Sequence, residues 1–261
     1  MSKKIEILEN KEALVAKAVA ICTQKIANAI ASQGRCTIAL AGGSTPKPVY
    51  EALAKQNLPW DKLIVFWGDE RYVAPDHPDS NQLMARQAWL DKVAIPESNI
   101  HPMPTDGESP AADAAKHEAH LREVFEISSG FPAFDLILLG MGDDGHTASL
   151  FPHTAVLHER EKAIAVGEKD KQPRLTFTVP LINQANCVLF LVAGANKNEA
   201  IGQILTDSTE TDLAKESSSA MSDKDLSYPA RLIKPQGELC WLLDRPAAGN
   251  LSFSSDVSLA S

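Results

Sequence analysis

The chain has 261 residues, of which 44% are hydrophobic, so it is long enough to bury one large core or two small ones. Its 25 basic and 34 acidic residues give a formal net charge of −9, and no block of consecutive Lys or Arg could follow a nucleic-acid backbone or an anionic membrane. These properties exclude nucleic acid and membranes as expected partners. A small anionic ligand remains compatible with them, because a pair of cations can dominate its own cleft.

The cysteines and the first residues indicate a reducing compartment. Cys22, Cys36, Cys187 and Cys240 lie far apart and form neither a CxxC pair nor a Cys/His set with zinc spacing. Three of them sit in apolar runs, as buried free thiols do. The opening MSKKIEILENKEAL lacks the apolar core of a signal peptide, and no uninterrupted apolar run approaches the ~20 residues of a membrane span. We therefore expect a cytoplasmic protein.

Helices and strands are predicted to alternate along the chain. From Lys11 to Gln33 apolar residues recur at spacings of four and three and predict a helix that Gly34 ends; the stripe consists of Val15, Val19, Cys22, Ile26 and Ile30. The next segments in chain order are a strand at 36–40, a helix at 46–55, a strand at 63–67, and helices at 81–93 and 111–127. They are followed by strands at 136–140, 163–166, 175–179 and 188–192, a helix at 196–205 and a strand at 239–243.

This order of elements predicts an α/β fold. Short, continuous apolar strands separated by helices are typical of a doubly wound, mostly parallel sheet with helices on both faces. In such sheets the ligand crevice lies beyond the carboxyl ends of the strands. We expect one domain over 1–245, with a flexible polar insertion at 206–229 and a disordered tail at 246–261, because both stretches are poor in apolar residues.

The stretch LAGGSTPKPVY takes the chain from a predicted strand into a predicted helix. Thr45 suits an N-cap and Pro46 suits the first helical position, while Gly42 and Gly43 leave backbone N–H groups and the hydroxyl of Ser44 facing the helix N-terminus. This arrangement is typical of a phosphate-binding loop. It is equally compatible with a tight strand-to-helix turn that binds nothing.

The stretch FWGDERY has three charged residues directly after a strand. Arg71 follows Asp69 and Glu70, and an Arg held between acids could donate two hydrogen bonds to an oxygen that carries negative charge. Taken alone, the three residues are also compatible with a salt-bridged cluster that closes the end of a strand.

The stretch LLGMGDDGHTASLFP combines a strand end with a histidine. His146 follows the strand with Asp144 two residues before it, which is the combination expected of a general base and a nearby carboxylate. Gly140, Gly142 and Gly145 would allow the backbone to approach a ligand closely. Metal binding is not expected here, because no second His or Cys with a recognised spacing accompanies DDGH.

These three stretches, in this order, resemble the bacterial 6-phosphogluconolactonases, which share a superfamily with the glucosamine-6-phosphate deaminases. The resemblance extends to PRLTFTVPLIN, LVAGANKNEAI and PARLIKPQGELCWLLD, so it covers nearly the whole chain. It implies a three-layer sandwich of the NagB/Rossmann-like type. It also implies hydrolysis of 6-phospho-D-glucono-1,5-lactone to 6-phospho-D-gluconate in the oxidative pentose phosphate pathway, with no cofactor and with a small sugar phosphate as the partner.

The resemblance also implies a role for individual residues. His146 matches the base that activates water, Asp144 would orient it, and Arg71 would hold the lactone or the oxyanion that forms from it. The residues implied in binding the substrate and its phosphate are Gly42, Gly43, Ser44, Thr45, Asp69, Arg174 and Lys197. The chain departs from the family pattern at Asp143, where Pro is common, and at His153, where Gly is common.

The sequence fits three alternative functions less well. A glucosamine-6-phosphate deaminase would carry a Glu five residues after the motif His and an aromatic residue after the Asp-Glu pair, where this chain has Phe151 and Arg71. A sugar-phosphate sensor would carry a basic helix-turn-helix segment, and none is expected before Leu14. A nicotinamide-binding protein would show GxGxxG after the first strand, which is absent. The sequence is compatible with a monomer or a small homo-oligomer.

Overall fold

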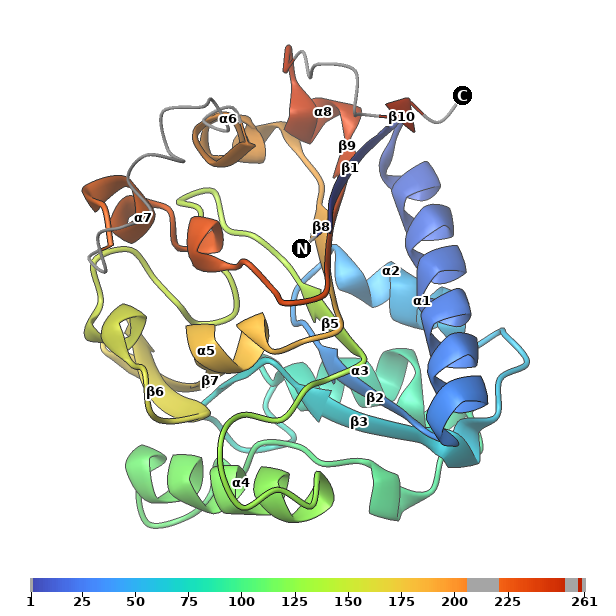
Figure 1. Cartoon of the computed structure of the whole chain (residues 1–261), viewed down its shortest axis with the longest axis vertical. Helices are drawn as coiled ribbons and strands as arrows, with labels where there is room; N and C mark the ends of the chain where they lie inside the picture. The colour runs from blue at the N-terminus through green and yellow to red at the C-terminus, as the bar shows by residue number, and fades with distance from the viewer. Residues whose placement is uncertain (1, 206–220, 252–257, 260–261) are drawn as a thin grey trace.

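A computed structural model describes residues 2–205, 221–251 and 258–259. Its centre is a parallel sheet of seven strands in the order β10-β1-β9-β8-β5-β2-β3 (Figure 1). The strands are β1 (Ser2–Leu8), β2 (Cys36–Leu40), β3 (Leu63–Trp67), β5 (Leu136–Leu139), β8 (Cys187–Val192), β9 (Glu238–Asp244) and β10 (Ser258–Leu259). The parallel sheet confirms the predicted α/β class.

Helices cover both faces of this sheet and complete a three-layer sandwich (Figure 1). One apolar layer contains buried residues of α1 (Lys11–Gln33), α2 (Pro46–Leu53) and α3 (Asn81–Ala88). The opposite layer contains residues of α4 (Pro110–Val124), α5 (Val179–Asn183), α6 (Asn198–Leu205) and α8 (Arg245–Ala248). The sequence also forms α7 (Asp223–Ser227) and the 3-10 turns Trp60–Lys62, Leu90–Lys92, Glu97–Asn99, η4 (Ala155–His158), η5 (Ala195–Lys197) and η6 (Pro229–Leu232).

Two of the predicted strands do not join the parallel sheet. The segments predicted at 163–166 and 175–179 form β6 (Ile164–Lys169) and β7 (Gln172–Phe177), which pair antiparallel with each other. β7 also pairs antiparallel with β4 (Asp69–Arg71), and the three strands form a separate sheet. The physical reason is the turn between β6 and β7, where Asp170 and Lys171 adopt φ values of 52° and 63°. A two-residue turn of this kind makes a hairpin, whereas parallel strands need a long crossover.

The strand β1 was missed because its sequence is charged. It pairs along its whole length with β9, and its second half is buried, including Glu6 at 2% exposure. Lys4 and Lys17 bind the Glu6 carboxylate at 2.6 and 2.8 Å, which compensates its burial. Helix boundaries also differ from the prediction. The helix predicted at 81–93 is shorter in the structure, because α3 ends at Ala88 and a 3-10 turn follows it.

The long helix α1 packs against the parallel sheet. Cys22 and Ile26 are buried as predicted, but the other predicted residues, Val15, Val19 and Ile30, are only partly buried. The residue before each of them is buried instead, so the buried residues are Leu14, Ala18, Cys22, Ile26 and Ala29. By length and composition alone α1 could also cross a membrane, with a mean hydropathy of 1.3 in its most apolar window. In the fold, Lys17 and Lys25 form ion pairs with side chains of the sheet.

Part of the predicted flexible insertion and part of the predicted tail form short helices. Residues 206–220 lie outside the described residues, but the last part of the predicted insertion is folded as α7, which begins with a capping box between Ser222 and Asp225. Within the tail predicted from 246, α8 spans Arg245–Ala248, and Asp244 accepts a hydrogen bond from the Ala247 N–H at 2.8 Å; residues 252–257 and 260–261 lie outside the described residues. Short capped helices in polar sequence explain both differences.

Candidate active site

A cavity of about 340 Å³ lies at the carboxyl ends of β2, β3, β5 and β8. This is the edge of the sheet at which the fold predicted a ligand crevice. Nine of the ten residues that the sequence suggested line the cavity, namely Gly42, Gly43, Ser44, Thr45, Asp69, Arg71, His146, Arg174 and Lys197. The tenth, Asp144, is hydrogen-bonded to His146. The fold therefore brings together side chains that are up to 155 residues apart in the chain, from Gly42 to Lys197.

The loop before α2 forms one wall of the cavity. Gly43 has a φ of 100°, and a Cβ on Gly42 would lie 1.9 Å from Oδ1 of Asn81, so both positions need glycine. Thr45 stands at the N-cap of α2 but makes no capping hydrogen bond, contrary to the prediction. Thr45 has helical φ and ψ values of −81° and −47° instead of the extended backbone of an N-cap, and Pro48 at the third helical position has no N–H to donate.

Asp69 and Glu70 do not clamp Arg71 as the sequence suggested. The Glu70 carboxylate accepts hydrogen bonds from the N–H groups of Arg71, Asn81 and Gln82 at 2.7–2.8 Å and so caps the N-terminus of α3. Burial raises the pKa of Glu70, although these N–H groups act in the opposite direction. Asp69, also buried, accepts a hydrogen bond from Ser149 Oγ at 2.7 Å. Both acids therefore hold the walls of the cavity in position.

Arg71 and Arg174 place two positive charges on neighbouring strands. They are register partners across β4 and β7, and both line the cavity. Arg71 donates a hydrogen bond to the carbonyl of Asp79, yet the Nε atoms of both arginines are buried without a partner among the described residues. Burial and the charge of Arg71 lower the pKa of Arg174. Two adjacent guanidinium groups with unused donors are suited to bind a multiply charged anion.

His146 and Asp144 form a hydrogen-bonded pair. The His146 Nδ1 atom lies 2.5 Å from Asp144 Oδ1, which also accepts the His146 backbone N–H at 3.1 Å. Burial alone would raise the pKa of Asp144, but the hydrogen bonds and charge of His146, helped by Lys169, lower it to about 2. An ionised Asp144 keeps the proton on Nδ1, which leaves Nε2 as the nitrogen able to accept a proton.

Two glycines allow this pair to form. A Cβ on Gly142 would lie 2.0 Å from His146 Nδ1 and 2.4 Å from Asp144 Oδ1, so any larger residue would displace the pair. The Gly142 N–H donates to the His146 carbonyl at 2.9 Å and closes the loop. Gly145 has a φ of 75°, and its Cβ would lie 2.8 Å from the ring of Tyr228. The segment that contains η6 therefore packs against the histidine loop.

Several residues of the site were not singled out as candidates. The Phe151 ring lies 4.5 Å from the His146 ring, and the cationic groups of Lys169 and Arg174 lie 5.3 and 5.4 Å from its centroid. Asn81 is buried, lines the cavity, and donates to the Asp69 carbonyl at 2.9 Å. The position of Phe151, within the histidine motif, was a usable signal. The contact of Asn81 with Gly42 depends on tertiary packing, and the sequence contains no signal for it.

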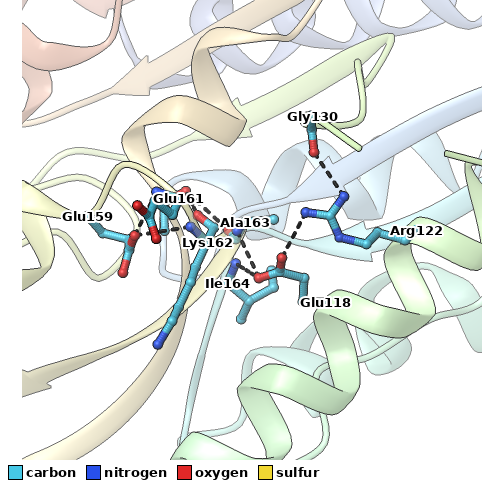
Figure 2. Close-up of polar contacts among 9 residues, drawn as sticks. Glu118, Arg122, Gly130, Glu159, Glu161, Lys162, Ala163 and Ile164 are labelled. Carbon is cyan, nitrogen blue, oxygen red and sulfur yellow. Dashed lines mark hydrogen bonds and ion pairs between the residues drawn. The ribbon is translucent and has the colours of Figure 1, made fainter. Parts of the chain in front are cut away.

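A larger groove of about 910 Å³ lies between α4 and the segment from η4 to β6. Figure 2 shows that three of its charged side chains, those of Glu118, Arg122 and Glu159, form hydrogen bonds with the backbone. Glu118 accepts hydrogen bonds from the N–H groups of Ala163 and Ile164 and pairs with Arg122, which also donates to the Gly130 carbonyl. Glu159 accepts three backbone N–H groups of its own loop. The smaller cavity contains the two arginines whose Nε atoms have no partner among the described residues.

The chain is similar to known sugar-phosphate enzymes over almost its whole length. The family described as glucosamine-6-phosphate isomerases/6-phosphogluconolactonase matches residues 9–241. The 6-phosphogluconolactonase of Nostoc sp. is 56% identical over 97% of this chain and 100% of its own, and that of Synechocystis sp. is 56% identical over 96% and 99%.

Solved structures agree with this similarity. The solved structure of 6-phosphogluconolactonase from Trypanosoma brucei is 30% identical, covers 96% of this chain and 99% of its own, and has a TM-score of 0.79. A monomeric glucosamine-6-phosphate deaminase, at 19% identity and a TM-score of 0.72, shares the fold. The match over 9–241 and the two relatives at 56% identity show that the chain belongs to the glucosamine-6-phosphate isomerase/6-phosphogluconolactonase family.

Proposed function

We propose that this protein is a 6-phosphogluconolactonase, which hydrolyses 6-phospho-D-glucono-1,5-lactone to 6-phospho-D-gluconate in the oxidative pentose phosphate pathway. The observation that carries the proposal is the His146–Asp144 pair at a cavity that also contains two guanidinium groups. A base and a set of cations are what the hydrolysis of a phosphorylated lactone requires. The names of the cyanobacterial relatives support the same reaction.

In the proposed mechanism His146 acts as a general base through Nε2. It removes a proton from a water molecule, whose oxygen attacks C1 of the lactone and converts the carbonyl oxygen into an oxyanion. The bond between C1 and the ring oxygen then breaks, and His146 returns the proton to that oxygen as it becomes the C5 hydroxyl. Asp144 holds the imidazole in the required tautomer and stabilises the imidazolium that forms. The reaction as proposed needs no metal and no cofactor.

The cations are proposed to divide between the two ends of the substrate. Arg71 would stabilise the oxyanion, while Arg174, Lys197 and the loop from Gly43 to Thr45 would bind the phosphate. Binding energy from the phosphate fixes the lactone over the base, which raises the rate of the chemical step. We assign Asp69 and Gly42 an indirect part, because Asp69 is engaged with Ser149 and Gly42 is packed against Asn81.

The test is the disappearance of the lactone with and without protein, since the lactone also opens unaided in water. We expect strong acceleration by the wild type and its loss in His146→Asn. His153→Asn is the matched control, because His153 lies on the same loop, is exposed, and has a φ of 56° that Asn tolerates. No acceleration over buffer, or equal activity of the two variants, would refute the proposal. Glucosamine 6-phosphate is assayed in parallel, and its turnover would favour the deaminase instead.

We extend the proposal to the setting of the enzyme. Residues 1–245 are proposed to act as one hydrolase domain, because the cavity draws residues from both the parallel sheet and the antiparallel sheet. The four buried free thiols support a cytoplasmic location. A monomer or small homo-oligomer is proposed, since every residue named in the mechanism comes from one chain; size-exclusion chromatography with light scattering measures the state directly.

A further inference from the structure

Two cysteines and a glutamate lie together at the edge of the sheet opposite the active site. Cys187 and Glu238 are the first residues of β8 and β9 and are register partners, and Cys240 follows Glu238 on the same face of β9. The two sulfur atoms and a carboxylate oxygen all lie within 4.8 Å of one another. In the described part of the chain this is the one group of three such ligands that is so close. We propose that Cys187, Glu238 and Cys240 form a zinc-binding site.

The chemistry of the three ligands fits a thiophilic divalent cation. Zinc is bound tetrahedrally by Cys sulfur at about 2.3 Å and by carboxylate oxygen at about 2.0–2.2 Å, so its ligands are about 3.5–3.7 Å apart. Because the ligand atoms lie within 4.8 Å of one another, each separation needs to contract by no more than about 1.3 Å to reach this spacing. Both thiols release their protons to solvent when the ion binds. A water molecule supplies the fourth ligand, because three protein ligands leave one tetrahedral position open.

A cation already lies beside the carboxylate. The ammonium group of Lys25, on α1, is 2.6 Å from Glu238 Oε1. Zinc displaces this contact, and Lys25 then supplies a third positive charge opposite the three negative charges of two thiolates and a carboxylate. The ion has a route into the site, because the Glu238 side chain is 49% exposed although the cysteines are buried.

A disulfide is the less suitable product of this arrangement. Cys187 is aligned with Glu238, so Cys240 is its diagonal neighbour. Parallel strands lie about 4.8 Å apart and rise about 3.3 Å per residue, so these diagonal Cα atoms are about 8 Å apart. A disulfide requires Cα atoms about 4.4–6.8 Å apart. A metal ion spans the longer separation, because it adds two metal–sulfur bonds between the side chains.

The experiment is a titration of the reduced, metal-free protein with Cd²⁺, a zinc analogue whose bonds to thiolate absorb in the ultraviolet. We expect a band that saturates at one equivalent and disappears when Zn²⁺ competes. It should be lost in Cys187→Ala and Cys240→Ala but retained in Cys36→Ala. Cys36 is the matched control, because it is also a buried first residue of a strand in the same apolar layer but lies outside the cluster.

A substitution of the exposed Glu238 tests the site without changing the core. Glu238→Gln should raise the Kd for Cd²⁺ at least about tenfold, because the carboxylate ligand is lost. Zn²⁺ should raise the Tm of the wild type more than that of Glu238→Gln, because an ion that binds only the folded state stabilises it. The absence of a saturable band, or a band of equal size in Cys240→Ala and Cys36→Ala, would overturn the proposal.

Discussion

Arg71 and Arg174 face each other as register partners on β4 and β7, and each has a buried Nε atom without a hydrogen-bond partner in the described part of the chain. Like charges at paired positions destabilise a sheet unless an anion lies between them. The two side chains are therefore held in an arrangement that is unfavourable without ligand and favourable with it.

Arg174→Met should weaken substrate binding more than it slows the chemical step. Loss of a charge-assisted hydrogen bond costs about 1.5–3 kcal/mol, which corresponds to a rise in KM of about 10- to 100-fold. The free protein should keep or gain thermal stability, because the repulsion between the two arginines is removed. Steady-state kinetics and thermal unfolding measure both effects. A fall in kcat with an unchanged KM would contradict the phosphate-binding role.

Asp144→Asn should lower kcat by about 100-fold or more while the fold is kept. The change removes the negative charge that holds the proton on His146 Nδ1 and stabilises the imidazolium. Asp143→Asn is the matched control, because Asp143 is the adjacent exposed acid. Equal losses of kcat in the two variants would show that general negative charge, and not the hydrogen bond, supports the base.

The pKa of Asp144 also predicts a limit at low pH. Its folded value of about 2 lies below its ordinary 3.8, so Asp144 contributes to stability above pH 3.8 and loses that contribution as the pH falls through about 2. The His146–Asp144 contact should therefore persist across any pH at which the enzyme is assayed. Carboxyl chemical shifts measured by NMR during acid titration test this value directly.

Gly142→Ala should lower kcat strongly, because the added Cβ would overlap His146 Nδ1 and Asp144 Oδ1 at 2.0 and 2.4 Å. Gly140→Ala is the matched control on the same loop, since a Cβ there meets nothing within 4 Å. We expect the control to keep kcat close to the wild-type value and to change only KM, because Gly140 lines the cavity. If both variants lose activity equally, the requirement for glycine lies in the motion of the loop and not in the space for the pair.

Phe151→Ala should impair His146 and Arg174 together. The ring packs on both side chains, so its removal loosens the base and a proposed phosphate ligand at once. We expect a lower kcat, a higher KM and partial rescue by Phe151→Tyr, which keeps the ring. A loss of Tm with unchanged kinetic constants would show that Phe151 serves the core alone.

A cluster of histidines away from the active site predicts acid sensitivity. Burial, with the charge of neighbouring His120, lowers the pKa of His101 from 6.5 to about 4, and burial, with the charges of His120 and His101, lowers that of His117 from 6.5 to about 3. The unfolded chain therefore binds more protons than the folded one between these values, and stability should fall as the pH drops from about 6.5 towards 3. His117→Phe should flatten this decline in urea unfolding, whereas the exposed His158→Gln should not.

The parts of the fold that could be predicted are those with a strong local signal. β2, β3, β5 and β8 are continuous apolar runs, so their positions followed from the sequence. β1 was missed because its lysines and Glu6 suggest an exposed segment, and their pairing is visible only after folding. The antiparallel sheet was not predicted, because the two-residue turn at Asp170 and Lys171 contains no glycine, which is the usual sequence signal of such a hairpin.

Some features of the candidate site also could be predicted from local motifs, whereas others could not. His146, Arg71 and the glycine loop lie in short motifs, so they could be proposed from sequence. The hydrogen bonds of Glu70 to α3 and of Asp69 to Ser149 join segments that are up to 80 residues apart, and no local pattern specifies them. An acid beside an Arg looks like its ion-pair partner until the burial of each group is known.

Pro46 and Pro48 also limit the number of backbone N–H groups that the cavity can offer to a phosphate. With two N–H groups missing from the first turn of α2, the fixed helix dipole contributes fewer donors, and long cationic side chains from β4, β7 and η5 must supply the rest. These side chains belong to separate parts of the fold. A bound phosphate would therefore act as a cross-link between the two sheets, and the protein should become stiffer and more resistant to proteolysis each time the substrate enters.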